Sequence, residues 1–245
     1  MPSVFQSIVA TRRSHRDTIL PESTVFDSEL EDLVKFALDN SPSYFNSQGS
    51  RAILVVKEDH QKLWDAAKES AKAVQSGEYL EGTLAKIDGW RNGYGTILIY
   101  DDEENLKGFQ AKIPPLAEIF VEHQAHSSGI LQFVLWTSLS EKGLGGSLQH
   151  QQALVQDYAK QAFGVADSWK LVAQIPFGKI KEGTVLPDRV NAPIETRFKA
   201  VGTSKEDPKT FLKTITTTTK TVKAADGSVV STETTTKTEL KPKLV

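Results

Sequence analysis

The feature that most constrains this chain is a change of composition near residue 203. The segment from Thr203 to Val245 contains 13 Thr and 8 Lys among its 43 residues, and Phe211 is its one aromatic residue. Such a segment has too few apolar side chains to offset the entropy lost on ordering it. We therefore expect residues 1–202 to form one folded domain and residues 203–245 to form an appended Thr/Lys-rich tail.

Two interpretations of the tail stay open. Its polar composition favours a disordered extension. Thr is nevertheless a good strand residue, and the Thr-rich stretches 213–223 and 228–239 flank Asp226-Gly227, a pair that is typical of hairpin turns. An isolated hairpin is marginally stable in water, so a hairpin here would be conditional on support from a sheet edge or a partner.

Charge and residue content exclude several classes of function. The first 202 residues carry 21 basic and 26 acidic side chains, a net charge of −5, whereas eight lysines and five acidic residues give the tail +3. An acidic domain argues against binding to nucleic acid. The chain has no Cys, which excludes disulfides, thiolate nucleophiles and Cys-ligated metals.

Membrane insertion and secretion are not expected either. No apolar run approaches the roughly 20 residues that span a bilayer. The N-terminal sequence Met1 to Gln6 lacks the basic and apolar regions of a signal peptide. We therefore expect a cytoplasmic protein, with a nuclear location also compatible, that binds no membrane.

The hydrophobic pattern of residues 1–202 predicts long helices around a small sheet, an α+β fold. Apolar runs predict strands at 52–56, 96–100 and 169–175, and the first is expected to be covered on both faces. Apolar residues at helical spacing predict helices over residues 4–12, 27–40, 58–75, 79–90, 114–142 and 151–163. The longest, 114–142, is expected to end at Gly143-Leu144-Gly145-Gly146.

Three segments carry side chains that suit a flat, phosphorylated ligand. Arg12-Arg13-Ser14-His15-Arg16 offers three guanidinium groups and a hydroxyl, which are good donors for a phosphomonoester, although an exposed basic turn is the alternative. Residues 41–50 join amides and hydroxyls to the rings of Tyr44 and Phe45, which could flank a heteroaromatic ring, or they form a plain polar turn. The glycines of 143–146 let a ligand approach the backbone, or they only cap the helix.

Metal and hydrolytic sites are not expected. Glu122, His123 and His126 lie within about one helical turn, but a dinuclear carboxylate site needs such groups from two helices. The nucleophile elbow of hydrolases and the Walker motif are both missing from the sequence.

In this order and spacing, the segments resemble the nitroreductase family of FMN-dependent oxidoreductases. The resemblance rests on Arg12 to Arg16, on Pro42 to Gln48, on the long helix with its glycines, and on Arg189 followed by Pro193-Ile194-Glu195. It covers roughly residues 3–200, and Gln110 to Pro114 is similar to the compact fungal branch. Gly49 stands where an aromatic residue often follows in the family, and Pro187 stands where a second late basic residue is usual.

The resemblance implies a mainly antiparallel central sheet flanked by helices, a long central helix, and an intertwined homodimer with two FMN sites at its interface. The residues that it assigns to the phosphate and ribityl chain are Arg12, Arg13, Ser14, Arg16 and Arg189. Those that would reach the flavin from the partner subunit are Pro42, Ser43, Tyr44, Asn46 and Gln48. Those at the ring edge would be Leu144, Gly145 and Gly146. Tyr44 and Phe45 would flank the substrate, with Trp90 and Tyr94 as further candidates.

The same resemblance implies that bound FMN, and no catalytic side chain, performs the redox step. A hydride would pass from NADH or NADPH to FMN and then to a flat, electron-poor aromatic acceptor, a nitroaromatic or a quinone, in a ping-pong cycle. The sequence does not distinguish the two nicotinamides, and a role in the stress response is a further expectation. The alternative hypothesis is a flavin-binding sensing module with little turnover, whose tail recruits a partner.

Overall fold

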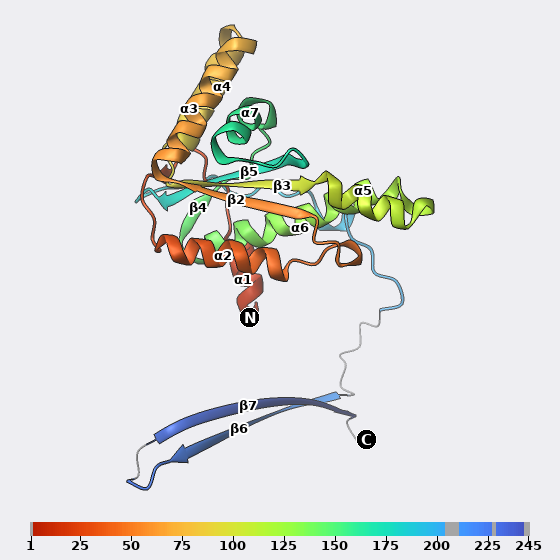
Figure 1. The fold of residues 1–245 in the computed structure, drawn as a ribbon. Coiled ribbons are helices and arrows are strands. Elements are labelled where there is room, and N and C mark those ends of the chain that lie inside the picture. Colours follow the sequence, from red (N-terminus) through yellow and green to blue (C-terminus); the bar gives the residue numbers. More distant parts are fainter. Residues whose placement is uncertain (1, 204–210, 227–228, 243–245) are drawn as a thin grey trace. The chain divides into compact units, whose positions relative to one another are not determined.

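The structure, a computed structural model, describes residues 2–203, 211–226 and 229–242. The chain divides into two compact units, Met1–Leu186 and Pro187–Val245. The described residues of the first unit form a five-stranded sheet with helices on both of its faces, which is the predicted α+β fold (Figure 1).

The sheet of the first unit is antiparallel throughout, which confirms the prediction. Its strands are β1 (Ile19–Leu20), β2 (Ser50–Val56), β3 (Gly95–Asp102), β4 (Leu144–Gly146) and β5 (Trp169–Ile180). Their order is β1-β5-β3-β2, and β4 also pairs with β5. Strand β3 is therefore covered by a neighbour on each side, and β2 forms an edge.

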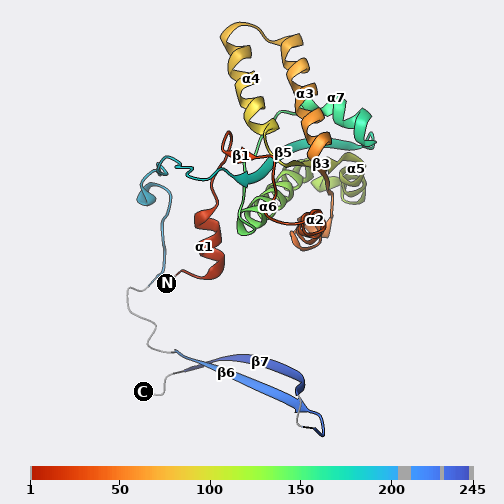
Figure 2. The same cartoon turned by 90° about the vertical axis from the view of Figure 1, so that its left-hand side faces the viewer.

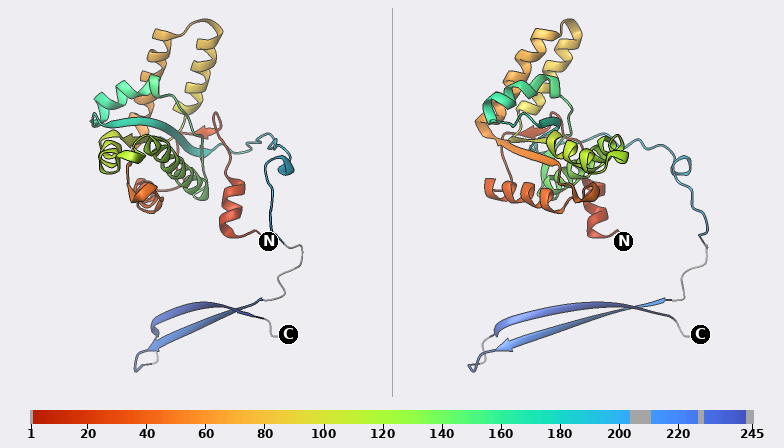
Figure 3. Two further views of the ribbon diagram at one scale, coloured as in Figure 1. Left: turned by 90° about the vertical axis from the view of Figure 1, so that its right-hand side faces the viewer. Right: turned by 45° about the vertical axis from the view of Figure 1, so that its right-hand side comes forward.

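The described part of the chain contains seven α-helices, all of them in the first unit. They are α1 (Val4–Thr11), α2 (Asp27–Asn40), α3 (Lys57–Val74), α4 (Gly77–Arg91), α5 (Glu103–Lys112), α6 (Ile119–Glu141) and α7 (Gln152–Phe163). Helices α2 and α6 lie on one face of the sheet, and α3, α4 and α7 lie on the other (Figures 2 and 3). Among the described residues, no helix is long and apolar enough to span a membrane.

A hydrophobic core fills each face of the sheet, because successive side chains of a strand point to opposite faces. Ile97 and Ile99 of β3 are fully buried against α2 and α6. Their neighbours Leu98 and Tyr100 are buried against α3, α4 and α7. The central strand thus anchors both helical layers, and its last residues carry the polar groups of the site described below.

Two predictions about these elements were confirmed, and one boundary was wrong. Strand β2 is covered on both faces, as predicted, because Leu54 packs against one core and Val55 against the other, although the strand lies at an edge of the sheet. The longest helix begins at Ile119, since Pro114–Leu116 forms a 3₁₀ turn in which the prolines donate no N–H. Gly143, with φ of 75°, follows the end of α6 as expected, but the next three residues continue as β4.

The described part of the second unit contains a hairpin. Its strands β6 (Phe211–Lys223) and β7 (Val229–Pro242) pair antiparallel, with Thr217 opposite Thr236. Of the predicted turn, Asp226 is described and Gly227 lies outside the described residues. The tail thus has the arrangement of the conditional hairpin, whereas the boundary at residue 203 and the order of the tail in solution stay predictions.

Candidate functional site

The basic segment 12–16 and the glycine segment 144–146 lie side by side. Ser14 pairs with Gly146 in a parallel bridge, and the N–H of His15 donates to the Gly146 carbonyl at 3.0 Å. A Cβ on Gly145 would lie 2.9 Å from Cγ of His15 and 2.8 Å from Cγ1 of Ile180, so a side chain there would force the two segments apart. The structure therefore brings together two predicted motifs that are far apart in the sequence.

Arg12 is held against the long helix α6. Its guanidinium lies 4.0 Å from the ring centroid of Trp136, a cation–π contact. The indole N–H of Trp136 donates to the same Gly146 carbonyl at 3.1 Å. Helix α6 thus fixes one end of the basic segment against the glycines, beside the buried Leu144.

The charge of this segment comes from its arginines. His15 is buried, with Nδ1 3.0 Å from Oγ1 of Thr18. Burial, and then the positive charge of Arg13, lower the pKa of His15 below its ordinary value, so its ring is mainly neutral at pH 7. Arg16 is exposed and Ser14 is half-buried, which leaves both within reach of a ligand.

The second predicted motif is the loop 42–48 between α2 and β2, which contains strained backbone. Three non-glycine residues have left-handed φ: Phe45 at 46°, Asn46 at 52° and Gln48 at 51°. Each costs on the order of 1 kcal/mol, so the surroundings must hold the conformation. The N–H of Tyr44 donates to Oγ of Ser127 on α6 at 3.1 Å, and the N–H of Gln48 donates to Oγ of Ser43 at 3.0 Å. Strain held in this way is typical of ligand-binding loops.

Two cavities flank this loop, and their sizes suit small-molecule sites. The first, of about 310 Å³, is polar, with Ser43, Gln48, Ser50 and Arg51 among its lining residues. The hydroxyl of Ser41, which also lines it, is buried without a hydrogen-bond partner among the described residues. The second cavity, of about 450 Å³, is mainly aromatic and is lined by Pro42, Ser43, Tyr44, Phe45, His123, His126, Ser127 and Ile130.

The aromatic cavity contains the two residues predicted to flank a substrate. The ring of Tyr44 stacks on Phe120 of α6 at 5.4 Å, whereas Phe45 is largely exposed. Of the other two aromatic candidates, Trp90 was wrong, and a substrate role for Tyr94 stays a prediction. Trp90 is 2% exposed and packs on Trp64 on the other face of the sheet, and the Tyr94 hydroxyl donates to Asp27 at the first core.

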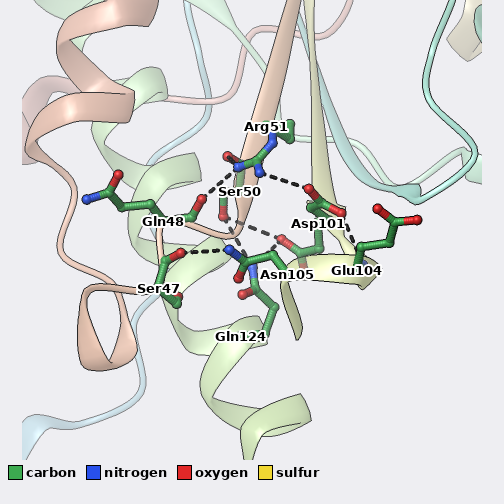
Figure 4. Close-up of polar contacts among 9 residues, drawn as sticks. Ser47, Gln48, Ser50, Arg51, Asp101, Glu104, Asn105 and Gln124 are labelled. Carbon is green, nitrogen blue, oxygen red and sulfur yellow. Dashed lines mark hydrogen bonds and ion pairs between the residues drawn. The ribbon is translucent and has the colours of Figure 1, made fainter. Parts of the chain in front are cut away.

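Four residues that the sequence prediction missed hold the end of the loop (Figure 4). They are Arg51 on β2, Asp101 at the end of β3, Asn105 on α5 and Gln124 on α6. Gln124 Nε2 donates to Oδ1 of Asp101 at 2.7 Å, and burial raises the pKa of this carboxyl although such donors oppose the shift. Gln124 is 3% exposed on the inward stripe of a helix, and a polar residue in an apolar stripe is the signal that could have identified it.

Two further predicted features fall elsewhere. Arg189 belongs to the second unit, and its expected phosphate contact stays a prediction. Nε2 of His126 lies 3.7 Å from Oε1 of Glu122. In the described ranges 2–203, 211–226 and 229–242, no three His, Asp or Glu side chains are placed to hold a metal ion.

The structure is an α+β fold in which an arginine-rich segment packs against a glycine segment and a separate strained loop is flanked by two cavities. The sequence model of the nitroreductase family matches residues 9–179, and the chain belongs to this family. It is therefore an oxidoreductase, as the predicted resemblance implied.

Individual relatives support the same assignment. The chain is 31% identical over 161 residues to nitroreductase FRM2 of Saccharomyces cerevisiae, covering 65% of this chain and 78% of FRM2, which confirms the fungal-type resemblance. Its structure is similar to that of nitroreductase CinD from Lactococcus lactis in complex with nicotinic acid, with a TM-score of 0.73, 29% identity, and coverage of 80% of this chain and 99% of CinD. A nitroreductase structure from Saccharomyces cerevisiae matches with a TM-score of 0.61 and 28% identity, over 74% of this chain and 98% of that one.

Proposed function

We propose that this chain is an FMN-dependent oxidoreductase. It moves a hydride from NADH or NADPH to a flat, electron-poor acceptor, a nitroaromatic or a quinone, in a ping-pong cycle. The observation that carries the proposal is the contact between the two segments, in which Ser14 pairs with Gly146 and His15 donates to the same glycine. The contact places the phosphate donors of the segment 12–16 beside the glycine backbone of the segment 144–146. A flat ring can approach such a backbone closely.

The donor set fits the phosphate of FMN. Arg12, Arg13, Ser14 and Arg16 would hold the phosphate and the ribityl chain, because guanidinium groups offer forked, permanently charged donors. His15, mainly neutral at pH 7, would position the backbone and add little charge. Phosphate affinity should therefore change little between pH 7 and pH 9, since arginine stays protonated.

The ring of the flavin would lie against the segment Leu144 to Gly146. Gly145 and Gly146 would let the ring edge approach the backbone, whose dipoles stabilise negative charge on the reduced ring. The loop residues Pro42, Ser43, Tyr44, Asn46 and Gln48 would contact the flavin of the partner subunit. Support comes from the polar cavity beside this loop, where the Ser41 hydroxyl is buried without a partner among the described residues.

The chemistry that bound FMN supplies is two-electron transfer, from NAD(P)H to the acceptor. The residues of this chain bind, orient and exclude water, and no side-chain acid or nucleophile is required. Tyr44 and Phe45 would flank the acceptor in the aromatic cavity. A structure of CinD was determined in complex with 4-nitrophenol, which supports a nitroaromatic as the acceptor class.

Exposed apolar side chains support the proposed homodimer. None of the eight residues of α1, all of them described, is buried, and Val4 and Phe5 are 78% and 64% exposed. Phe36 of α2 and Val121 of α6 are also largely exposed. Apolar side chains in such number on neighbouring elements are typical of a subunit interface. Size-exclusion chromatography with light scattering should give twice the mass of the chain.

The first experiment tests the flavin. Purified or FMN-reconstituted protein should absorb at about 450 nm, as oxidised flavins do. Arg16→Gln should weaken FMN at least about tenfold but leave riboflavin affinity unchanged, because riboflavin has no phosphate. Lys35→Gln, an exposed charge change on α2, is the matched control. Protein that takes up no FMN on reconstitution would refute the proposal.

The second experiment tests turnover. Initial rates with NADH or NADPH against a quinone and a nitroaromatic should give the parallel double-reciprocal lines of a ping-pong cycle. Bound FMN without oxidation of either nicotinamide would instead support the sensing module.

A further inference from the structure

Three consecutive carbonyl groups where the loop meets β2 each accept a hydrogen bond from a different donor. Figure 4 shows the first two, on Ser47 and Gln48. The Ser47 carbonyl accepts from Nδ2 of Asn105 at 2.9 Å. The Gln48 carbonyl accepts from Nη1 of Arg51 at 2.6 Å, and the Gly49 carbonyl accepts from a β3 backbone N–H at 2.8 Å. Helix α5 and strands β2 and β3 therefore fix this end of the loop together.

Arg51, one of these donors, and the amide of Gln124, which donates to none of the three carbonyls, are each anchored by a carboxylate. Nη2 of Arg51 donates to Oδ2 of Asp102 at 2.8 Å, a largely buried ion pair. Nε2 of Gln124 donates to Oδ1 of Asp101 at 2.7 Å, and Ser50 Oγ lies 3.4 Å from the same Asp101 oxygen. Two neighbouring carboxylates at the end of the central strand thus set the orientation of a guanidinium and an amide.

Gly49 lies against two amide side chains, those of Gln124 and Asn105. A Cβ on Gly49 would lie 2.6 Å from Oε1 of Gln124 and 2.9 Å from Oδ1 of Asn105. Both oxygens are buried without a hydrogen-bond partner among the described residues, which is a cost that proteins tolerate mainly where another constraint demands it. The two amides fill the space of a side chain at position 49. The chain passes between them only because this residue is glycine.

We propose that Asn105 and Gln124, the latter oriented by Asp101, are positioning residues for the loop 42–48. They hold its strained residues in the conformation in which Ser43 and Asn46 meet the flavin. The inference rests on the proposed function and extends it to residues on α5 and α6 that do not touch the cofactor. A preset loop loses less conformational entropy when the cofactor binds, and this raises affinity.

The test compares FMN affinity with loop order in the full-length protein. Asn105→Ala and Gln124→Ala should each weaken FMN about tenfold and speed hydrogen exchange at the Ser47 and Gln48 amides of the apo-protein. Asp101→Asn should stay within about threefold of wild type, because its amide oxygen still accepts from Gln124. A flavin titration followed by fluorescence quenching gives the affinities.

The matched control is Thr96→Val, which removes an equally buried polar group at the other end of β3. It should lower the melting temperature without changing FMN affinity, whereas an equal loss of affinity there would overturn the inference. If the wild-type protein binds FMN and the affinities of Asn105→Ala and Gln124→Ala lie within about twofold of the wild-type affinity, the inference is wrong but the proposed function stands. Wild-type protein that does not bind FMN would overturn the proposed function. Asn105 is half-buried, so its variant carries the test if Gln124→Ala does not fold.

Discussion

Acidification should destabilise the first unit through one buried histidine, His60 of α3. Its side chain is fully buried, with Nδ1 2.9 Å from Oγ1 of Thr96 and Nε2 3.2 Å from the Arg91 carbonyl. The carbonyl can only accept, so the hydrogen lies on Nε2 and the Thr96 hydroxyl donates to Nδ1. The same hydroxyl oxygen accepts from the Trp64 indole at 2.9 Å. A proton added to Nδ1 would leave this hydroxyl facing two donors.

The magnitude follows from the shifted pKa. Burial lowers the pKa of His60 from 6.5 to about 4. Below pH 6.5 the unfolded chain binds a proton that the folded chain does not take up until about pH 4, so stability is present above 6.5 and is lost on acidification. Between pH 7.5 and pH 4.5 this linkage removes about 2.5 kcal/mol from the free energy of unfolding.

The contributions of other titratable groups to the pH dependence of stability can be separated from that of His60. His15 also has a lowered pKa and acts in the same direction, whereas the raised pKa of Asp101 acts in the opposite direction. Asp27 and Asp65 have pKa values below 3.8, so their contributions are lost below this window. A variant without the His60 imidazole therefore isolates its contribution.

The assay is urea unfolding followed by tryptophan fluorescence at four pH values from 7.5 to 4.5. His60→Gln should lose about 2.5 kcal/mol less than wild type across this range, whatever its stability at pH 7.5. Gly108→Ala, which changes no titratable group and has open space around its Cβ, should keep the wild-type profile. Parallel profiles for wild type and His60→Gln would refute the reasoning.

Three substitutions and one control test the packing of the first unit. Gly145→Ala should weaken FMN about tenfold in a flavin titration, because its Cβ would meet His15; Gly108→Ala, with open space around its Cβ, should leave the affinity unchanged and raise stability by about 0.5–1 kcal/mol. Gly49→Ala should lower the free energy of unfolding by about 1–3 kcal/mol and speed hydrogen exchange in the loop 42–48, and wild-type exchange there would contradict the close contact. Thr96→Val should cost about 2–3 kcal/mol in urea unfolding, since it leaves two buried polar groups unpaired, and a neutral result would contradict the hydrogen bonds assigned to them.

Periodicity predicted six of the seven α-helices in the described part of the chain, and it missed α5, which has no buried stripe. The spacing of residues 27–40 predicts an inward stripe of Leu30, Leu33, Val34, Ala37 and Leu38, of which the first four are buried and Leu38 is half-buried. Helix α5 has ten residues, all described and none buried, so it offers no apolar stripe to detect. The runs at 52–56 and 96–100 look alike in sequence, but strand pairing makes one an edge and the other central. Pairing depends on contacts between distant segments, which a local pattern does not contain.

The residues of the candidate site likewise divide into those that a local sequence pattern predicted and those that it missed. The segments 12–16 and 42–48 were found because their chemistry is concentrated in a few consecutive residues. Arg51, Asp101, Asn105 and Gln124 come from four different elements and meet only in the folded chain. Two of these residues interrupt an apolar pattern: Asp101 follows an apolar strand run, and Gln124 lies in an apolar helix stripe. A buried polar residue in such a position needs a hydrogen-bond partner.

The long helix α6 shows what buried polar residues in a helix can indicate. Its first half buries Gln124, Ser127 and Ser128 together with Phe120, whereas its second half buries Leu131, Leu135 and Leu139 together with Thr137. Ser127 accepts from the Tyr44 N–H, and Gln124 and Ser128 both hydrogen-bond to Asp101. The leucines instead pack in the core against the sheet. The three buried polar residues of α6 therefore lie where the helix meets the loop 42–48 and Asp101, and the three leucines lie where it meets the sheet. Ser128→Leu should remove the interaction of Ser128 with Asp101 and place an apolar side chain beside the loop. FMN binding, measured in a flavin titration, should become weaker.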